Sequence, residues 1–167
     1  MKTANHPLAK NHRNILNKHF TSVGEKLAQK LPETDTNPNS YLGEKNKMSI
    51  FMSEVERHEI IEEIQGIIEK KAMGIDNIPP KVIKWAPHVF TPILKVIFDK
   101  CLEQGIYPQG MKIAKVIPIH KGGDINDVNN YRPISILTQF NRIFERILSK
   151  RLMSFLKNKV ITSKQFG

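Results

Sequence analysis

Residues 115–137, KVIPIHKGGDINDVNNYRPISIL, place two β-favouring runs on either side of a polar turn. Ile and Val favour strands, whereas Gly, Asp and Asn favour turns. The stretch therefore predicts an antiparallel β-hairpin. Pro118 and Pro133 each lack the N–H group that a strand ladder uses, so we expect both prolines at edges or at outward-facing positions.

Two cationic side chains flank the predicted turn, Lys121 at its rim and Arg132 across it. Gly122 and Gly123 would let backbone amides approach a ligand. Lys supplies a point charge and Arg a planar, bidentate fork, and both groups bind phosphate. A triphosphate suits this set of groups, and an ordinary solvated hairpin is the alternative that local chemistry leaves open. The turn is not a Walker loop, because G-x-x-x-x-G-K-[ST] does not occur in the chain.

Apolar residues recur at helical spacing in most of the remaining chain. The predicted helices cover residues 12–31, about 53–74, a short segment from about 79, 87–105 and 139–158. Pro32 ends the first helix, a capping box of Ser53 and Glu56 starts the second, and Gly74 and Gly105 supply left-handed ends to the second and fourth. The predicted fold class is an α-rich α+β fold with several helices around one antiparallel β-hairpin.

The composition of residues 32–50 differs from that of the flanking helices. The segment combines Pro, Asn, Thr, Ser and Gly with few large apolar residues, which is typical of a linker. We therefore divide the chain into a helical segment at 1–31, a linker at 32–50 and a larger region at 51–167.

The chain carries 26 Lys and Arg against 16 Asp and Glu, a formal charge of +10. Such a charge attracts polyanions, so nucleic acid is the expected partner, and a basic surface that only maintains solubility is the alternative. Basic residues at steps of four along residues 139–158 form a stripe opposite the apolar face. The predicted nucleic-acid contacts are Lys112, Lys115, Arg142, Arg146, Lys150 and Lys157. A solvated helix face is the alternative for the stripe.

Signals for catalysis or metal binding are missing. The single cysteine, Cys101, excludes a disulfide framework and lies on a predicted apolar helix face, so we expect an inert core thiol. The six histidines show no metal-ligand spacing, and Ser135 lacks a nucleophile elbow. We assign no catalytic and no metal-binding residue. Without an apolar leader or a run of ~18 apolar residues, we expect an intracellular protein of the cytoplasm or nucleus that does not enter a membrane.

Four blocks carry a family resemblance in their order and spacing. They are GIDNIPPKVIK (74–84), GIYPQGMKIAKVIPIHKGGD (105–124), NYRPISIL (130–137) and ERILSKRL (145–152). Together they resemble the fingers region of reverse transcriptases from non-long-terminal-repeat (LINE-type, jockey-like) retrotransposons. Residues 15–32 look like the segment that precedes the polymerase in such elements.

The resemblance implies an RNA-directed DNA polymerase whose fingers hairpin closes over the incoming deoxynucleoside triphosphate. Lys121 and Arg132 match the basic residues of that hairpin and by similarity would touch the triphosphate. RNA template, DNA primer and deoxynucleoside triphosphate would be the partners of the complete enzyme. Two Mg²⁺ ions would serve its chemistry, held by carboxylates of the palm.

The chain departs from the family because nothing matches the aromatic-Ala-Asp-Asp block of the palm. We therefore expect the N-terminal part of a polymerase, without palm and thumb and inactive alone, in which Ile60, Ile64, Phe98 and Ile143 would face the missing palm. A truncated element copy, a partial gene model and a fragment remain open as its origin. A basic helical nucleic-acid-binding module and an inert relic are the alternative functions.

Overall fold

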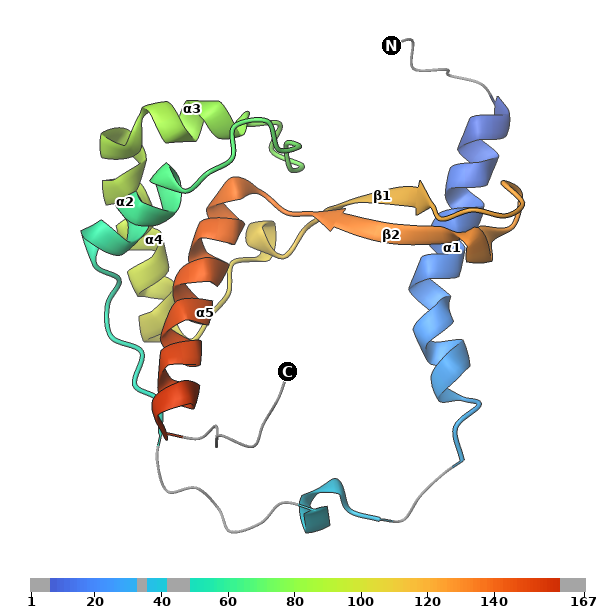
Figure 1. Cartoon of the computed structure of the whole chain (residues 1–167), viewed down its shortest axis with the longest axis horizontal. Coiled ribbons are helices and arrows are strands. Elements are labelled where there is room, and N and C mark those ends of the chain that lie inside the picture. The colour runs from blue at the N-terminus through green and yellow to red at the C-terminus, as the bar shows by residue number, and fades with distance from the viewer. Residues whose placement is uncertain (1–6, 33–35, 42–48, 160–167) are drawn as a thin grey trace. The chain divides into compact units, whose positions relative to one another are not determined.

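The computed structural model describes residues 7–32, 36–41 and 49–159 (Figure 1). Its elements are α1 (Pro7–Ala28), η1 (Pro38–Tyr41), α2 (Arg57–Gln65), α3 (Pro80–Trp85), α4 (Pro87–Gln104), η2 (Gln109–Met111), β1 (Lys115–His120), η3 (Val128–Asn130), β2 (Tyr131–Ile136) and α5 (Gln139–Lys159). Within the described residues the strands form one two-stranded antiparallel sheet, and most other residues are helical. An α-rich fold with one hairpin is therefore confirmed, whereas its identity as polymerase fingers stays a prediction.

The chain forms two compact units. The first contains α1 and the hairpin residues Val116–Ile134, and the second contains α2 to α5. Part of the predicted linker, 33–35 and 42–48, lies outside the described residues, and Pro38–Tyr41 within it forms one 3-10 turn. The division at residues 31 and 50 stays a prediction.

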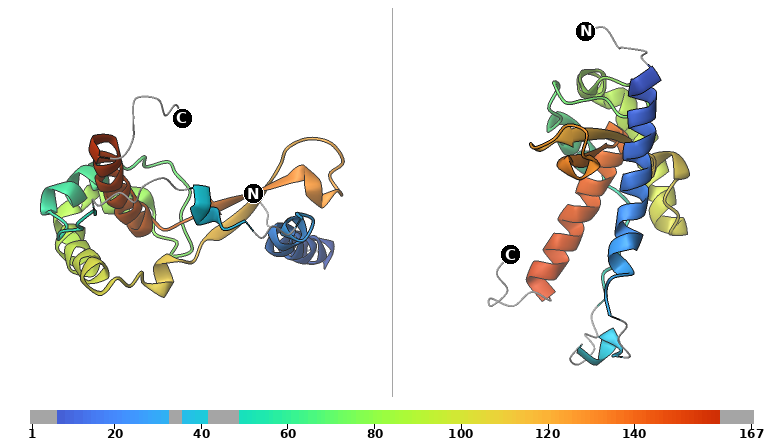
Figure 2. Two further views of the ribbon diagram at one scale, coloured as in Figure 1. Left: turned by 90° about the horizontal axis from the view of Figure 1, so that it is seen from below. Right: turned by 90° about the vertical axis from the view of Figure 1, so that its right-hand side faces the viewer.

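The core of the second unit lies between three helices. α2 packs against both α4 and α5 (Figures 1 and 2). The rings of Phe98 and Phe144 stack at its centre, with centroids 4.5 Å apart. Cys101 is buried on the same face of α4, and burial raises the pKa of its thiol, as expected for an inert core residue.

The expectation that four apolar side chains would face a missing palm is wrong. Ile60, Ile64, Phe98 and Ile143 are all almost completely buried within this unit. These side chains pack against one another between α2, α4 and α5, so they form the hydrophobic core of this unit itself.

The start of α2 differs from the prediction. The helix begins at Arg57, and its capping box is formed by Glu56 and Glu59, where the Glu56 amide donates to the Glu59 carboxylate at 2.8 Å. Ser53 stays outside the helix because hydrogen bonds to α4 and α5 hold the residues before α2 in a non-helical conformation. The Val55 amide donates to Asp99 at 2.7 Å, and Arg151 donates to the Ser53 carbonyl at 2.6 Å. Contacts with distant residues thus override a local capping signal.

The end of α2 also differs, and it gives Gly74 another role. The helix stops at Gln65, and Gly74 does not have a positive φ. Instead, a Cβ atom at Gly74 would lie 2.8 Å from the Cα and N atoms of Thr138. Glycine is needed here because two backbone segments pass close together just before α5. By contrast, Gly105 ends α4 with φ 64°, as predicted.

Replacing Gly74 with alanine is therefore expected to destabilise the second unit by about 1–3 kcal/mol, because the added methyl group meets backbone that must shift. Urea denaturation followed by circular dichroism measures the change. Gly110→Ala is the matched control, since a Cβ atom there has no neighbour within 4 Å. Equal stability of the two variants would contradict the close approach at Thr138.

The helix of residues 12–31 was expected to run to Pro32, but α1 ends at Ala28. Two overlapping hydrogen-bonded turns extend the backbone from the helix end to Leu31. The Lys30 amide donates to the Leu27 carbonyl at 3.1 Å, and the Leu31 amide donates to the Ala28 carbonyl at 3.0 Å. None of the described helices is both long and apolar enough to cross a membrane.

Candidate nucleic-acid interface

The register of the hairpin follows from one hydrogen bond at its closed end. The Lys121 amide donates to the Asn130 carbonyl at 2.8 Å. Because β1 and β2 each have six residues, His120 lies opposite Tyr131, and their ring centroids are 5.2 Å apart. The strands are therefore paired without a bulge.

This register places Pro118 directly opposite Pro133. Pairs alternate along an antiparallel ladder, and this one lies at a position where backbone groups point away from the partner strand. Neither proline removes a bond from the ladder. The prediction that both prolines lie at edges or at outward-facing positions is confirmed, because both strands of this two-stranded sheet are edges.

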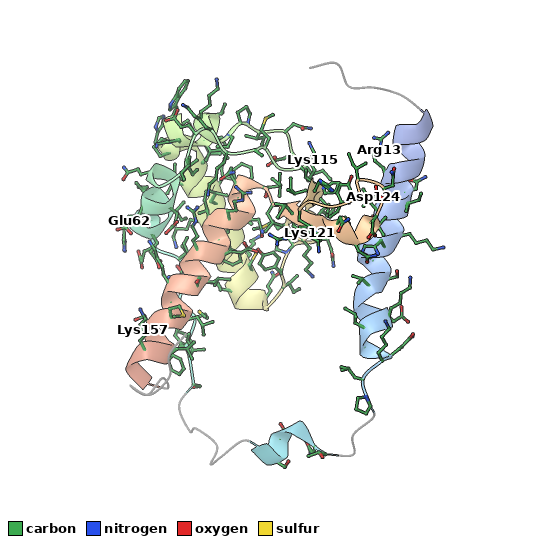
Figure 3. All side chains as sticks on the ribbon, turned by 45° about the vertical axis from the view of Figure 1, so that its right-hand side comes forward. Arg13, Glu62, Lys115, Lys121, Asp124 and Lys157 are labelled. Carbon is green, nitrogen blue, oxygen red and sulfur yellow. The ribbon has the colours of Figure 1, made fainter. Side chains whose placement is uncertain are left out.

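Lys121 and Arg132 lie on the same face of the hairpin. Arg132 pairs with Ile119 of β1. Lys121 directly follows β1, and its hydrogen bond to Asn130 continues the ladder by one residue. From this register we infer that Lys121 shares the face of Ile119 and is a diagonal neighbour of Arg132. Both side chains are exposed, and neither forms an ion pair with a described carboxylate. Figure 3 labels Lys121 beside the turn that carries Asp124.

The opposite face of the hairpin meets α1. Val116 and Pro118 line a cavity of about 220 Å³ together with Leu16 and Phe20 of α1, and Leu16 is buried. The hairpin face that carries Val116 and Pro118 is therefore covered by α1. On the other face Ile119 and Ile134 stay about half exposed beside the two cations.

The turn itself is held by its own polar groups. Gly122 and Gly123 have φ values of 113° and 85°, and a Cβ atom at Gly123 would lie 2.7 Å from the Asn130 amide nitrogen. This nitrogen is Nδ2 of the Asn130 side chain, and it donates to the Asp124 backbone carbonyl at 3.0 Å. The Asp124 carboxylate accepts from the Asn126 amide at 2.9 Å, so it serves the turn, as predicted.

The basic stripe of α5 is largely engaged within the fold. Arg146 Nη1 lies 3.3 Å from Glu63 Oε2, and Lys150 Nζ lies 2.6 Å from Glu63 Oε1. Glu63 is only 5% exposed, and its hydrogen bond with Lys150 raises the pKa of that lysine. Two of the three predicted stripe residues thus neutralise a buried carboxylate of α2, and the stripe is not simply a solvated face. Their contact with nucleic acid stays a prediction.

The remaining predicted nucleic-acid contacts are distributed over three parts of the chain. Lys112 follows η2, Lys115 begins β1, and Arg142 and Lys157 lie on α5. Figure 3 labels Lys115 and Lys157. None of these four forms an ion pair with a described carboxylate, and Arg142 is half-buried. Their contact with nucleic acid also stays a prediction.

Arg151 was not singled out from the sequence, yet it makes the densest set of contacts on α5. It donates to both carboxylate oxygens of Glu59, at 2.9 and 2.5 Å, and to the carbonyls of Ser53 and Glu54. The hydrogen bond from Arg151 lowers the pKa of Glu59. The acidic residues of α2 indicate that basic partners are needed. The sequence does not show that Arg151 is the partner of Glu59, because the two residues are 92 positions apart.

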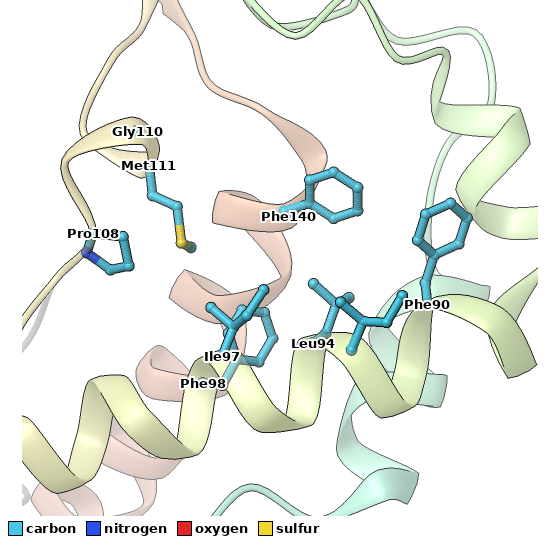
Figure 4. A pocket seen from close by; sticks show the side chains of 9 residues that line it. Phe90, Leu94, Ile97, Phe98, Pro108, Gly110, Met111 and Phe140 are labelled. Atoms are coloured by element: carbon cyan, nitrogen blue, oxygen red, sulfur yellow. The ribbon is translucent and has the colours of Figure 1, made fainter.

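An open apolar groove of about 310 Å³ lies on α4 (Figure 4). Its lining residues are Phe90, Ile93, Leu94, Ile97, Phe98, Pro108, Gly110, Met111 and Phe140. A surface of this kind suits apolar contact rather than phosphate, so it does not belong to the cationic interface. Among the described residues no group of three His, Cys, Asp or Glu side chains could hold a metal ion.

Curated relatives of the chain come from mobile elements. It is 35% identical over 129 residues to "RNA-directed DNA polymerase from mobile element jockey" of Drosophila melanogaster, a match covering 76% of the chain and 14% of the relative. It is 30% identical over 123 residues to "Probable RNA-directed DNA polymerase from transposon BS" of the same species, covering 72% and 14%. The protein of transposon X-element is 28% identical over 141 residues, covering 83% and 15%.

No family model matches the chain. The chain spans about one seventh of the length of these relatives. The names of these relatives agree with the resemblance drawn from the sequence blocks. The relatives that match about three quarters of this chain are thus named RNA-directed DNA polymerases of jockey-like and other non-LTR retrotransposons, and the chain is similar to one part of them.

Proposed function

We propose that this chain is the fingers part of a retrotransposon RNA-directed DNA polymerase and that its hairpin binds the phosphates of the incoming deoxynucleoside triphosphate. One observation carries the proposal: Lys121 and Arg132 are diagonal neighbours on an exposed hairpin face, and no described carboxylate neutralises them. The names of the relatives supply the class of substrate.

The two cations are suited to different parts of one ligand. The guanidinium of Arg132 can hold two oxygens of one phosphate, while the ammonium of Lys121 acts as a point charge on another. The turn keeps its shape through its own hydrogen bonds, so the two side chains are mounted on a fixed backbone. Their task is to bind and orient the triphosphate.

RNA template and DNA primer are the proposed nucleic-acid partners of the complete enzyme. We assign template contacts to Lys112, Lys115, Arg142 and Lys157, whose charges no described carboxylate offsets. Arg146 and Lys150 should contribute least, because binding phosphate would compete with Glu63. An intracellular site, cytoplasmic or nuclear, is proposed because template and nucleotides occur there.

The two Mg²⁺ ions of such an enzyme supply the activation of the 3′-hydroxyl and the stabilisation of the leaving pyrophosphate. The described residues do not fit these ions, because no group of three ligating side chains occurs among them. We assign no metal-dependent step to this chain and propose that palm and thumb regions supply it. The chain by itself is then inactive.

The proposal is tested by grafting residues 49–159 into the matching region of a related polymerase. Arg132→Ala should raise the apparent KM for nucleotide by roughly 10- to 150-fold, the equivalent of one charge-assisted contact of about 1.5–3 kcal/mol. Arg132→Lys should recover part of the loss, and Lys121→Ala should act in the same direction. Steady-state primer extension on an RNA template is the measurement.

Lys100→Ala is the control for these variants, because Lys100 is an exposed lysine of α4 and has no described ion-pair partner. It should leave the KM for nucleotide unchanged. The phosphate contact is refuted if Arg132→Ala leaves this KM unchanged while the melting temperature or the template affinity falls.

A further inference from the structure

The most exposed aromatic surface on the described helices lies at the end of α3. Trp85, the single tryptophan of the chain, is 68% exposed. α3 buries Pro80 and Ile83, so the core does not need the indole. Lys81, one turn earlier, places its ammonium nitrogen 5.8 Å from the centre of the indole ring. A large π-surface next to a cation is thus presented to solvent.

Further positive charge lies on the segment after α2, which contacts α3 through Lys84. Lys84 Nζ donates to the Ile67 carbonyl at 3.0 Å and lies 3.8 Å from the Glu69 carboxylate. These two contacts hold the chain after α2 alongside the end of α3. Lys70 and Lys71 directly follow Glu69, are exposed, and form no ion pair with a described carboxylate.

The acidic side chains of residues 69–85 are outnumbered by the basic ones. Glu69 and Asp76 are the two carboxylates of this stretch, against the four lysines Lys70, Lys71, Lys81 and Lys84. The Glu69 carboxylate lies 3.8 Å from the Lys84 ammonium, and Asp76 accepts from the Ile78 amide at 3.2 Å. We use the name α3 surface for Trp85 and Lys81 together with Lys70 and Lys71, the exposed lysines that follow the segment held by Lys84.

We propose that the α3 surface binds single-stranded nucleic acid, with a base stacked on Trp85 and the lysines on the phosphates. Exposed aromatic rings with surrounding cations are the physical basis of sequence-tolerant single-strand binding. A single strand is favoured over a duplex because its bases can leave the stack and reach a ring. A protein partner is less well matched, because charged lysines are depleted from the centres of protein interfaces and Lys81 lies over the indole.

This site is separate from the hairpin. It lies entirely within the second unit, and neither Lys121 nor Arg132 takes part in it. Binding here requires neither nucleotide nor catalysis. Failure of one proposal therefore leaves the other standing.

Intrinsic fluorescence tests the proposal on the chain as it is, because Trp85 is the sole indole reporter. Titration with a 12-nucleotide oligothymidylate should quench the emission to a plateau, and the apparent affinity should fall as salt is raised. Heparin, a polyanion without bases, should produce much less quenching. No quenching, or equal quenching by both, would overturn base stacking on Trp85.

Variants separate stacking from charge, using the anisotropy of a labelled oligothymidylate. Trp85→Ala should weaken binding by roughly 5- to 150-fold, and Trp85→Phe should fall between it and the original chain. Lys81→Gln should reduce the slope of log affinity against log salt by about 0.7. Circular dichroism melts verify that each variant is folded.

Lys100→Gln is the matched control, since it removes one exposed lysine about 20 Å further along α4. It should leave the affinity close to that of the original chain. If Trp85→Ala binds as tightly as Lys100→Gln, the indole serves another partner, such as a protein surface, and the proposal is wrong.

Discussion

Phe98→Ala is expected to lower the free energy of unfolding by about 3–5 kcal/mol, as is typical for a buried phenylalanine. The ring is completely buried and stacks on Phe144, with centroids 4.5 Å apart, at the place where α2, α4 and α5 meet. Alanine would leave a cavity between α4 and α5 that the helices can only partly close. Urea denaturation of the chain measures the loss.

Two companion variants keep this result interpretable. Phe98→Leu retains most of the apolar volume and should cost distinctly less, so it gives a folded reference if the alanine variant does not fold. Val96→Ala changes a largely exposed residue of the same helix and should alter stability by only about 0.5 kcal/mol. A loss under about 1 kcal/mol for Phe98→Ala would mean that the helices do not pack around this ring.

Arg151→Ala is expected to cost about 2–4 kcal/mol, because one substitution removes a bidentate ion pair and two hydrogen bonds to carbonyls. The lost contacts join the extended segment at Ser53 and Glu54 to α5. Arg151→Lys should restore only part of the stability. Lys157→Ala, on an exposed part of the same helix, is the control and should be nearly neutral.

Acid provides an independent test of the same ion pair. Arg151 lowers the pKa of Glu59, so the pair stabilises the fold above the ordinary pKa of a glutamate. This contribution is lost as the pH falls through the lowered pKa. Melting temperatures of the original chain should therefore decline more steeply in acid than those of Arg151→Ala. Parallel pH profiles would contradict the ion pair.

Features with local causes could be predicted from the sequence. The hairpin follows from two β-favouring runs around a turn, the left-handed end of α4 from Gly105, and the burial of Cys101 from its place in an apolar pattern. The two candidate phosphate-binding residues were chosen from local sequence and from the family resemblance, and their role stays a prediction. Their common face could not be predicted, because it depends on the register that the bond from Lys121 to Asn130 establishes.

Features with distant causes were missed. Ser53 carries a capping signal, but Arg151 and Asp99 hold its segment extended. Arg146 looked like part of an open basic stripe because its partner, Glu63, lies eighty-three residues earlier. Trp85 escaped notice because spacing alone does not reveal which side of a short helix remains uncovered. Contacts between helices and segments that are distant in the sequence account for these missed features, and the local helix propensity of each segment does not reveal such contacts.

The facing prolines of the hairpin have a consequence for how the protein behaves among other chains. A two-stranded sheet has two open edges, and each edge is a template on which a foreign strand could add. Pro118 and Pro133 interrupt both edges at the same level, since each lacks the outward donor that an incoming strand would need there. The hairpin is thereby protected against strand addition and β-aggregation along either edge.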